Sequence, residues 1–473
     1  MKGAKNIVAV DLGAESGRVI LCRWTGTDGT LEEIHRFPNG PHQADGHLVW
    51  DVERLWQEIR NGLHLASTKT QGDIASVGID GWGVDCMLLD KAGNRVGHAY
   101  CYRDARNLPQ MERAFSMISR KRIYEITGIQ FMPLNTLFQL LAHVAEFPAE
   151  WERASLWLNL PEYFQFRLCG VMAAEYTEAS TTQLLDVFTK SWSQELAGAL
   201  NLSLDKFPPI VEAGTILGKL RSELAQEVGL SDALVIAPAC HDTGSAVAGI
   251  PFPHDGLAFI SSGTWSLVGT VLRNPVVTEQ GLEKNFTNEG GVANSIRFLK
   301  NIVGMWLVQE CLREWNAQGL QLTAADLAEK CAGISPDGPF FPLADEAAFL
   351  EPGNMVARIN AALRAQGFAE ETRPAGLAAI IFRSLAMRYA EVIREVVKIS
   401  GKGIRRICIV GGGVKNETVN RLAGQVTGYE IVRGPSESTA AGNAAVQIAA
   451  LENAFSLEQI QSIAARLKYQ AGN

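Results

Sequence analysis

Two stretches of this chain follow the same pattern although they stand 250 positions apart. Residues 8–20 and residues 258–269 each consist of a short apolar run, a small polar turn and a second apolar run, and Gly13 matches Gly263. This pattern is typical of two strands joined by a tight glycine turn. Because such a turn lets backbone N–H groups approach an anion, two copies predict a duplicated scaffold that grips a polyphosphate. The alternative is two ordinary hairpins in two α/β domains.

The chain is long enough for two domains. It has 473 residues, and a single hydrophobic core rarely grows beyond roughly 250–300 residues. The segment 250–256 concentrates proline and glycine and is the best candidate for a boundary. We therefore expect one domain at 1–248 and a second at 249–473.

Composition narrows the class of partner. The net charge of −8 disfavours nucleic acid, and a sugar or another small neutral substrate fits better. The eight cysteines are scattered without a Cys-x-x-Cys pair, which indicates thiols in a reducing cytosol rather than a zinc ribbon or a disulfide scaffold. The first apolar run, 7–10, stops at Asp11 and is too short for a signal peptide, and no later run is long enough for a membrane span. We expect a cytoplasmic protein without a membrane partner.

Strand-like and helix-like stretches alternate along both halves, which predicts an α/β fold with a partly parallel sheet in each half. Residues 84–89 read as the strand that pairs with 74–79, and residues 108–202 read as mostly helical. Other strands are predicted at 6–10, 19–24, 234–237, 406–410 and 429–432, and helices at 51–66, 302–315, 376–399, from Glu417 onward with Asn416 as N-cap, and after Pro435.

Three consecutive glycines, Gly411, Gly412 and Gly413, lie between a predicted buried strand and a predicted helix. They could leave an open floor on which a flat ligand or a phosphate lies against the backbone. The alternative is a tight turn that needs one glycine. Neither the dinucleotide fingerprint, Walker A nor a protein-kinase signature is present, so a nucleotide site must be of another type.

Asp242 is the best catalytic candidate. It follows a short apolar strand, where ligand sites of α/β proteins lie, and His241 and Thr243 flank it. A carboxylate there could accept a proton from a hydroxyl that attacks a γ-phosphate. The alternative is a cap of the helix that begins near Gly244. Cys240, His241 and Asp242 are not a nucleophilic triad, because adjacent side chains diverge.

Other residues have a functional and a plain interpretation. Asp11 could hold Mg²⁺ or could satisfy its own turn, and Arg18 could bind phosphate or be solvated. Trp82, between two glycines, could stack on a sugar or belong to the core. Asn301 is predicted at the N-terminus of the helix 302–315, with Gln309 two turns in.

With these residues assembled, the chain resembles the FGGY family of carbohydrate kinases, within the actin-like ATPase superfamily. The likeness is carried by residues 11–18, 35–37, 82–85, 102–104, 128–131, 135–137, 175–177, 241–243, 261–266, 287–291, 300–302 and 411–413. The resemblance implies two duplicated ribonuclease-H-like domains with an interdomain cleft. It places the sugar and the catalytic base in 1–248 and the nucleotide in 249–473.

The resemblance also implies a role for each candidate residue. Asp242 would be the general base. The sugar would contact Gly83, His241, Asp242, Thr243 and Asn301, and Trp82 is added to these sugar-binding candidates for its place between two glycines. ATP would contact Ala14, Glu15, Ser16, Gly17, Arg18, Thr264, Gln309 and Gly412. Mg²⁺ would bridge the phosphates near Asp11.

The implied activity is ATP-dependent phosphorylation of a ketose at O1, with L-rhamnulose as the favoured substrate. L-Fuculose and L-xylulose are alternatives within the same chemistry, and a non-catalytic nucleotide-gated regulator on the same scaffold is an alternative of another class. Three residues depart from the family pattern: Glu15 lies in the phosphate turn, and Gly81 and Cys86 lie beside the implied sugar pocket.

Overall fold

The computed structural model describes residues 4–230, 232–343, 346–349 and 351–470. They fall into two compact units that alternate along the chain. The first unit contains Met1–Pro253, Leu272–Arg297 and Ser438–Asn473, and the second contains His254–Val271 and Phe298–Glu437.

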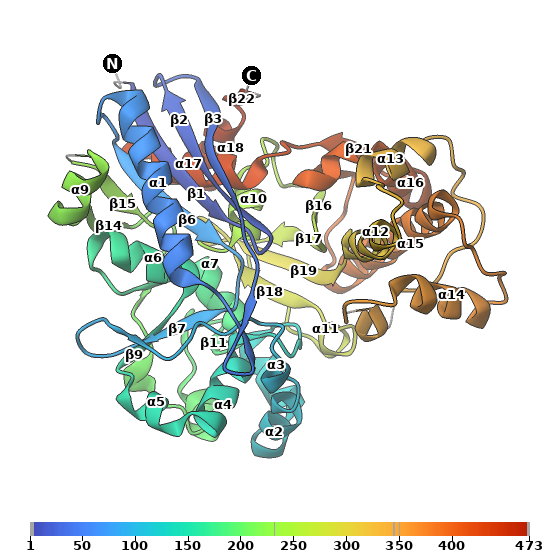
Figure 1. The fold of residues 1–473 in the computed structure, drawn as a ribbon, viewed down its shortest axis with the longest axis horizontal. Coiled ribbons are helices and arrows are strands. Elements are labelled where there is room, and N and C mark those ends of the chain that lie inside the picture. Colours follow the sequence, from blue (N-terminus) through green and yellow to red (C-terminus); the bar gives the residue numbers. More distant parts are fainter. Residues whose placement is uncertain (1–3, 231, 344–345, 350, 471–473) are drawn as a thin grey trace. The chain divides into compact units, whose positions relative to one another are not determined.

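The first unit is built on a seven-stranded mixed sheet (Figure 1). In spatial order its strands are β14 (Ile216–Lys219), β15 (Leu234–Ile236), β6 (Ser76–Gly81), β1 (Lys5–Leu12), β2 (Ser16–Trp24), β3 (Gly29–Pro38) and β22 (Leu467–Gln470). β1 pairs with β2 in antiparallel fashion and with β6 in parallel fashion, and β15 is parallel to β6.

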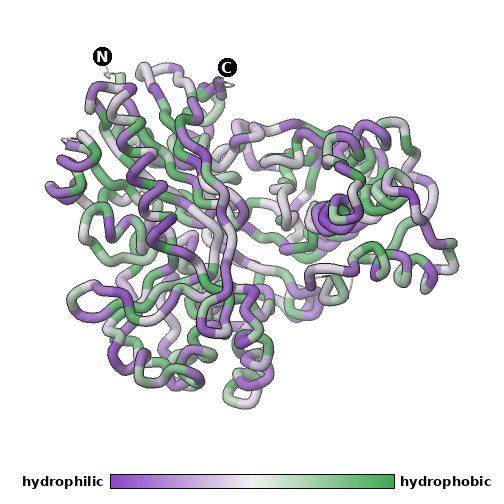
Figure 2. The backbone as a smooth tube through the Cα atoms, viewed as in Figure 1, coloured by the Kyte–Doolittle hydropathy of each residue, from purple (hydrophilic) through white to green (hydrophobic). Residues whose placement is uncertain are grey.

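Helices cover both faces of this sheet, which explains why β1 is apolar without alternation. Val8 and Val10 pack on one face against α1 (Val52–Thr70), whereas Ile7 and Ala9 pack on the other face against a helix near the C-terminus. Hydrophobic and hydrophilic residues alternate along α1, as expected for a helix with one buried side (Figure 2). The other covering helices are α6 (Leu160–Cys169), α9 (Ser222–Val228), α10 (Asp242–Ala248), α17 (Ser438–Leu451) and α18 (Leu457–Ala464).

The chain between residues 86 and 207 forms short elements, most of which pack into a second apolar cluster of the first unit, apart from the seven-stranded sheet. The helices are α2 (Gln110–Met117), α3 (Arg120–Thr127), α4 (Thr136–Glu146), α5 (Pro148–Arg153), α7 (Tyr176–Ala179) and α8 (Gln194–Ala199). The strands are β7 (Cys86–Leu89), β8 (Arg95–Val96), β9 (Leu156–Asn159), β10 (Ala174–Glu175), β11 (Leu185–Asp186) and β12 (Ser191–Trp192). The remaining elements of this unit are β4 (His42–Ala44), β5 (His47–Val49), β13 (Ile210–Val211), α11 (Glu279–Glu283) and β18 (Thr287–Gly290).

The second unit is built on five consecutive strands of a six-stranded sheet, in the order β19 (Ile296–Val303), β17 (Trp265–Leu272), β16 (Leu257–Ser262), β20 (Arg406–Val410) and β21 (Glu430–Arg433). Its helices are α12 (Trp306–Ala317), α13 (Ala324–Lys330), α14 (Met355–Ala365), α15 (Pro374–Ser400) and α16 (Glu417–Thr427). Asn416 caps α16, since its side chain accepts from the N–H of Val419.

The two sheets repeat one topology. In the first, β1 is antiparallel to β2 and parallel to β6; in the second, β16 is antiparallel to β17 and parallel to β20. Each series adds another parallel strand on the far side, β15 in the first unit and β21 in the second. The predicted duplication of an α/β scaffold is therefore confirmed.

One predicted pairing is wrong. The strand within 84–89 is β7, and it does not pair with β6; it lies in a separate sheet in the order β8-β7-β9. The cause is the backbone of Val84, whose φ of +75° turns the chain away from the first sheet.

None of the helices in the described part of the chain combines the length and the apolar character that a bilayer crossing requires. All eight cysteines lie within the described residues and are free thiols, as their spacing predicted.

Candidate active site

Three aspartates gather at one edge of the first sheet. Since β1, β6 and β15 are parallel, their carboxyl ends meet there. Asp11 and Asp80 occupy paired register positions on β1 and β6. Asp242 opens α10 shortly after β15, and Gly81 at the end of β6 bridges His241 in parallel fashion.

Asp11 is held by a neighbouring cation. Its buried carboxylate accepts from Nε of Arg18 at 2.9 Å and lies 2.8 Å from Nη2, and both contacts fall on Oδ2. Arg18 is therefore paired with Asp11. A phosphate bound by Arg18, as predicted, would have to share its guanidinium with the Asp11 carboxylate. Among the described residues no group of three or more His, Cys, Asp or Glu could hold a metal by itself. A single oxygen-donor carboxylate still suits Mg²⁺, which keeps several waters and binds substrate phosphates.

The phosphate-turn candidates Ala14, Glu15, Ser16 and Gly17 lie in or beside the loop between β1 and β2. The N–H of Gly13 donates to the carbonyl of Ser16 at 3.1 Å and closes the loop. Glu15 is exposed, so its carboxylate is not confined within the turn. Gly17 has a packing reason, because a Cβ there would lie 2.2 Å from the ring of Phe37.

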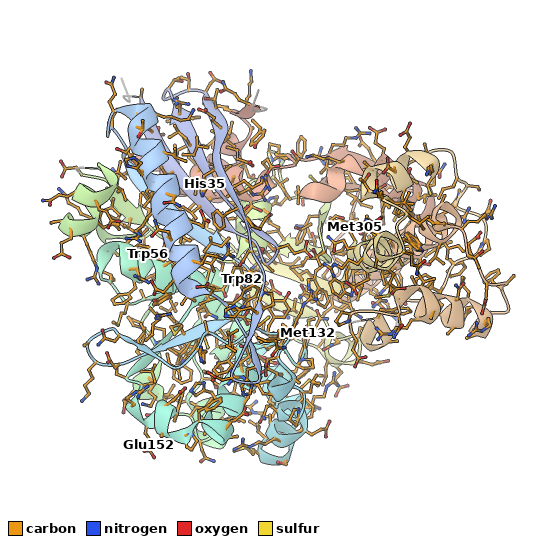
Figure 3. All side chains as sticks on the ribbon, viewed as in Figure 1. His35, Trp56, Trp82, Met132, Glu152 and Met305 are labelled. Carbon is orange, nitrogen blue, oxygen red and sulfur yellow. The ribbon has the colours of Figure 1, made fainter. Side chains whose placement is uncertain are left out.

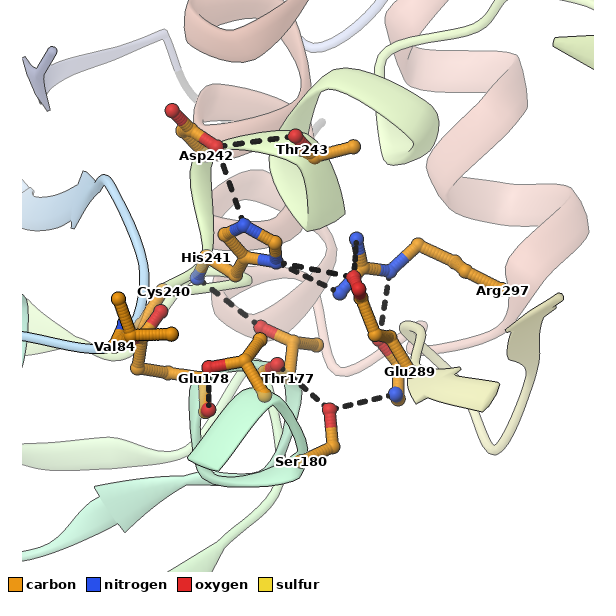
Figure 4. Close-up of polar contacts among 12 residues, drawn as sticks. Val84, Thr177, Glu178, Ser180, Cys240, His241, Asp242, Thr243, Glu289 and Arg297 are labelled. Atoms are coloured by element: carbon orange, nitrogen blue, oxygen red, sulfur yellow. Dashed lines mark hydrogen bonds and ion pairs between the residues drawn. The ribbon is translucent and has the colours of Figure 1, made fainter. Parts of the chain in front are cut away.

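Asp242 is the first residue of α10 and not its N-cap. The N-cap is His241, and no side-chain capping bond is formed, so the capping alternative is wrong. Oδ1 of Asp242 accepts from the hydroxyl of Thr243 at 3.1 Å (Figure 4). Burial raises the pKa of Asp242 above its ordinary value, and the nearby charge of Asp11 adds to this.

The loop after β6 lies against His241. A Cβ on Gly83 would meet the His241 ring and the Thr181 hydroxyl at 3.4 Å, which is ordinary van der Waals contact. The backbone of Val84 is clamped on both sides. Its N–H donates to the Glu178 carboxylate at 3.0 Å, and its carbonyl accepts from the Thr136 hydroxyl at 2.7 Å. This clamp offsets the strain of a β-branched residue at positive φ, about 1–3 kcal/mol.

Trp82 is a core residue rather than a sugar platform. The residue is 6% exposed, and its ring packs on Trp50 with a centroid distance of 4.4 Å. Both indoles donate to the buried carboxylate of Asp85, Trp50 at 2.5 Å and Trp82 at 3.0 Å. Trp82 and Trp56 both lie in the first unit (Figure 3). The predicted role of Trp82 in stacking on a sugar is therefore wrong, since too little of the residue is exposed to contact a ligand.

The departures at Gly81 and Cys86 also have packing explanations. A Cβ on Gly81 would meet the carbonyl of Leu12 at 3.1 Å and Pro161 at 3.2 Å, so a larger residue would press on the sheet. Cys86 begins β7, opposite Asn159 of β9, and contacts the second apolar cluster of the first unit.

Three buried glutamates lie in and around α6 and α7, and one of them contacts the residue before His241. Glu162 accepts from the N–H of Glu175 at 3.0 Å, and Glu175 accepts from the N–H of Cys240 at 2.8 Å. Burial raises the pKa of Glu162 to about 8 and that of Glu175 to about 7, and it raises the pKa of Glu178 well above the ordinary value. Cys240, two residues before Asp242, is thus hydrogen-bonded to an acid whose neutral form is favoured by burial.

Glu162→Gln is expected to make the protein more stable at alkaline pH. A carboxyl whose pKa is raised by folding binds its proton more tightly in the folded state, so its contribution to stability falls as pH rises from about 4.3 to about 8. Glutamine mimics the neutral acid. Thermal unfolding between pH 4 and pH 9 should show nearly equal stability at the acid end and a gain of several kcal/mol, at most about 5 kcal/mol, at the alkaline end.

The control is Glu152→Gln on α5, an exposed glutamate (Figure 3). It should leave the pH profile of the melting temperature unchanged. If the profile of Glu162→Gln also ran parallel to that of the wild type, Glu162 would not be a neutral buried acid.

In the second unit, Thr264 and Gln309 come together although 45 positions separate them. The side-chain amide of Gln309 donates to the Thr264 hydroxyl at 3.5 Å. The hairpin turn is fixed to the start of α12, since the N–H groups of Gly304 and Trp306 both donate to the Thr264 carbonyl at 3.1 Å. Gly304 permits this approach, because a Cβ there would lie 2.7 Å from Ser266.

The predicted place of Asn301 is wrong. It belongs to β19, and the helix predicted from 302 begins only at Trp306, so Asn301 is a strand residue and Gln309 lies one turn into α12. Ile302 and Val303, predicted as the start of that helix, are buried strand residues.

The glycine loop begins a short 3₁₀ turn between β20 and α16. Gly411 has φ of +79°, and a Cβ on Gly413 would collide with the Ser262 hydroxyl at 2.1 Å. Gly412 is different: it is exposed, and a Cβ there would meet nothing within 4 Å. The fold explains two of the three glycines, whereas no packing contact requires a glycine at position 412.

Several residues at these sites were missed by sequence reasoning. Glu178 and Arg297 act through long-range contacts, and no local pattern marks them. Gly304 lies inside the helix predicted at 302–315, and an isolated glycine in a helical pattern could have flagged a packing constraint there.

Comparison with known proteins identifies the family of this chain. Residues 6–249 match the N-terminal domain of the FGGY family of carbohydrate kinases, and residues 258–451 match its C-terminal domain. A protein named rhamnulokinase from Oceanobacillus iheyensis is 40% identical over 96% of this chain and 95% of its own length. The rhamnulokinase of Bacillus subtilis is 39% identical over 96% of this chain and 92% of its own length.

Solved structures share the fold. A ligand-bound xylulose kinase from Lactobacillus acidophilus matches with a TM-score of 0.79 at 16% identity, over 97% of this chain and 92% of that one. Plasmodium falciparum glycerol kinase with ADP matches with a TM-score of 0.79 at 15% identity, over 99% of this chain and 94% of that one. Taken with the family domains that cover most of its length, the chain belongs to the FGGY family of carbohydrate kinases and uses ATP.

Proposed function

We propose that this kinase transfers the γ-phosphoryl group of ATP to the O1 hydroxyl of L-rhamnulose, giving L-rhamnulose 1-phosphate in L-rhamnose catabolism. The relatives named rhamnulokinase, 37–40% identical over nearly the whole chain, support this substrate. The observation that carries the proposal is Asp242, which sits at the carboxyl edge of the first sheet beside His241, Thr243 and Gly83.

Asp242 is the general base in this proposal. The sugar hydroxyl gives its proton to the carboxylate as it attacks the phosphorus. The raised pKa of Asp242 makes it a stronger base than an ordinary aspartate, while the Thr243 hydroxyl holds its orientation. Gly83, His241 and Thr243 would contact the sugar. Asn301 is kept as a sugar contact only from the family resemblance.

The nucleotide would use the two hairpin turns and the glycine loop. Residues 14–18 and Thr264 would offer donors to the phosphates, while Gln309 and Gly412 would line the remainder of the site. Mg²⁺ held near Asp11 would neutralise charge on the phosphates. The scaffold alone also fits a nucleotide-gated regulator, but such a protein has no need of a base beside a histidine and a threonine.

The test is ADP release with MgATP against L-rhamnulose, L-fuculose, L-xylulose, L-ribulose, D-xylulose and glycerol. We expect kcat/KM for L-rhamnulose to exceed the others at least tenfold, about 1.4 kcal/mol of transition-state discrimination. Coupling between phosphorus and the C1 protons of the product would locate the phosphate on O1.

Two outcomes would contradict the proposal at different levels. Preference for another ketose would keep the phosphotransfer and replace the substrate. Absence of sugar-stimulated ADP release with every compound would remove the kinase reaction and favour the regulator.

A further inference from the structure

A buried arginine touches the histidine that precedes the base. Arg297 is 0% exposed, and its Nη2 lies 3.1 Å from Nδ1 of His241 (Figure 4). On the opposite side of the ring, Nε2 of His241 lies 3.5 Å from Oδ1 of Asp242. The imidazole therefore stands between a permanent cation and the proposed catalytic carboxylate.

This contact decides which ring nitrogen carries the proton. A guanidinium has donors and no acceptor, and it stays charged in proteins. Nδ1 of His241 must then present its lone pair to Arg297, because a proton there would oppose an N–H donor at 3.1 Å. In the neutral ring the remaining proton belongs to Nε2, the nitrogen that faces Asp242.

Arg297 is itself fixed, so the contact is not a chance rotamer. Its Nε donates to the carbonyl of Gly290 at 2.8 Å, and Nη1 lies 3.0 Å from Oε2 of Glu289. The strand segment that holds both partners is fastened to the loop below His241, since the N–H of Gly290 donates to Ser180 at 2.7 Å. The backbone N–H of His241 in turn donates to the Thr177 hydroxyl at 3.3 Å.

Glu289 could support the opposite tautomer, since its Oε2 lies 3.5 Å from Nδ1 of His241. Arg297 is closer to Nδ1 and also lies within ion-pair distance of the same carboxylate oxygen. The Glu289 carboxylate therefore pairs with the guanidinium of Arg297, and the guanidinium is the group that contacts Nδ1 of His241.

We propose that Arg297 is a positioning residue that fixes His241 as the Nε2–H tautomer, so that this N–H donates toward Asp242 and a substrate hydroxyl. The second half of this statement rests on the proposed function. The tautomer itself does not, because it follows from the contacts of Arg297 alone.

The first experiment measures the tautomer directly. Long-range ¹H–¹⁵N spectra of the ¹⁵N-histidine-labelled protein separate a protonated from an unprotonated ring nitrogen, and His241→Gln identifies the His241 signals among the eight histidines. We expect an unprotonated Nδ1 and a protonated Nε2 at pH 8. A protonated Nδ1 would overturn the proposal, whatever the enzyme phosphorylates.

The second experiment removes the donor. Arg297→Met combined with Glu289→Gln takes out both charges and should let His241 populate both tautomers in the same spectra. We expect about a tenfold loss in kcat/KM for the sugar, with the KM for ATP unchanged within about twofold. Arg297→Lys, which restores a cationic donor, should recover part of the loss and return the Nε2–H signal.

The matched control is Arg388→Met on α15, another buried arginine, which pairs with Glu391. It should leave both the His241 spectrum and the sugar kinetics as in the wild type. An unchanged tautomer in the Arg297 variant would overturn the positioning role. A wild type with the expected tautomer and no sugar-dependent turnover would instead overturn the proposed function and keep the assignment of Arg297.

Discussion

Asp242→Asn is expected to lower kcat by about 10²–10⁴-fold while ATP still binds, because a general base contributes on that order and asparagine cannot take up the proton. Asparagine matches aspartate in size and can keep the hydrogen bond from the Thr243 hydroxyl, so the start of α10 should stay intact. Steady-state kinetics gives kcat, and calorimetry gives the affinity for ATP. Near-normal turnover would remove Asp242 as the base.

The pH profile gives an independent check on the same residue. A base must be ionised, so kcat should fall as the pH is lowered and Asp242 takes up a proton. Because burial raises the pKa of Asp242, this fall should begin at a higher pH than for an ordinary aspartate. The matched control is Asp232→Asn, an exposed aspartate paired with Lys219, which should leave kcat and its pH dependence unchanged.

The hairpins and parallel strands were predictable from sequence because their signal is local. A strand buried on both faces reads as an unbroken apolar run, and 6–10, 19–24 and 406–410 all lie within strands. Recurrence of one pattern after 250 residues was enough to predict the duplication. The two turns are not identical: Leu12 and Gly17 are the last pair before the first turn, whereas Ser262 and Ser266 enclose a turn one residue shorter.

What sequence could not predict depends on partners far along the chain. Residues 84–89 had the right composition for a strand, but the sheet they join was decided by the clamp on Val84, whose contacts come from Thr136 and Glu178. Trp82 has the same neighbours in sequence whether it stacks on a sugar or on another ring, and only its contact with Trp50 decides.

The candidate site divides in the same way. Asp242 could be placed at the end of a strand because strand ends are visible in sequence, whereas Asp80 was not singled out. The tautomer of His241 could not be predicted, since Arg297 lies 56 positions away. Local pattern thus predicts which groups are available for chemistry, whereas long-range contacts determine their protonation and orientation.

Gly412→Val is expected to raise the KM for ATP about tenfold to a hundredfold and to leave the KM for the sugar nearly unchanged. A valine there meets no protein atom within 4 Å of its Cβ, so the free enzyme can accommodate it. The side chain would instead occupy the space over the loop, where overpacking costs about 1–3 kcal/mol. Initial-rate kinetics with each substrate varied in turn measures both constants, and an unchanged KM for ATP would place the nucleotide elsewhere.

The neighbouring glycine provides the control that separates a ligand floor from a tight turn. A Cβ on Gly413 would lie 2.1 Å from the Ser262 hydroxyl and 2.3 Å from its Cβ, so Gly413→Ala must displace the end of β16. We expect this variant to lose about 1–3 kcal/mol of stability, visible as a lower melting temperature, whereas Gly412→Val should melt like the wild type. If Gly412→Val lost the same stability, the whole loop would be a structural turn, and its effect on ATP could no longer be attributed to contact with the nucleotide.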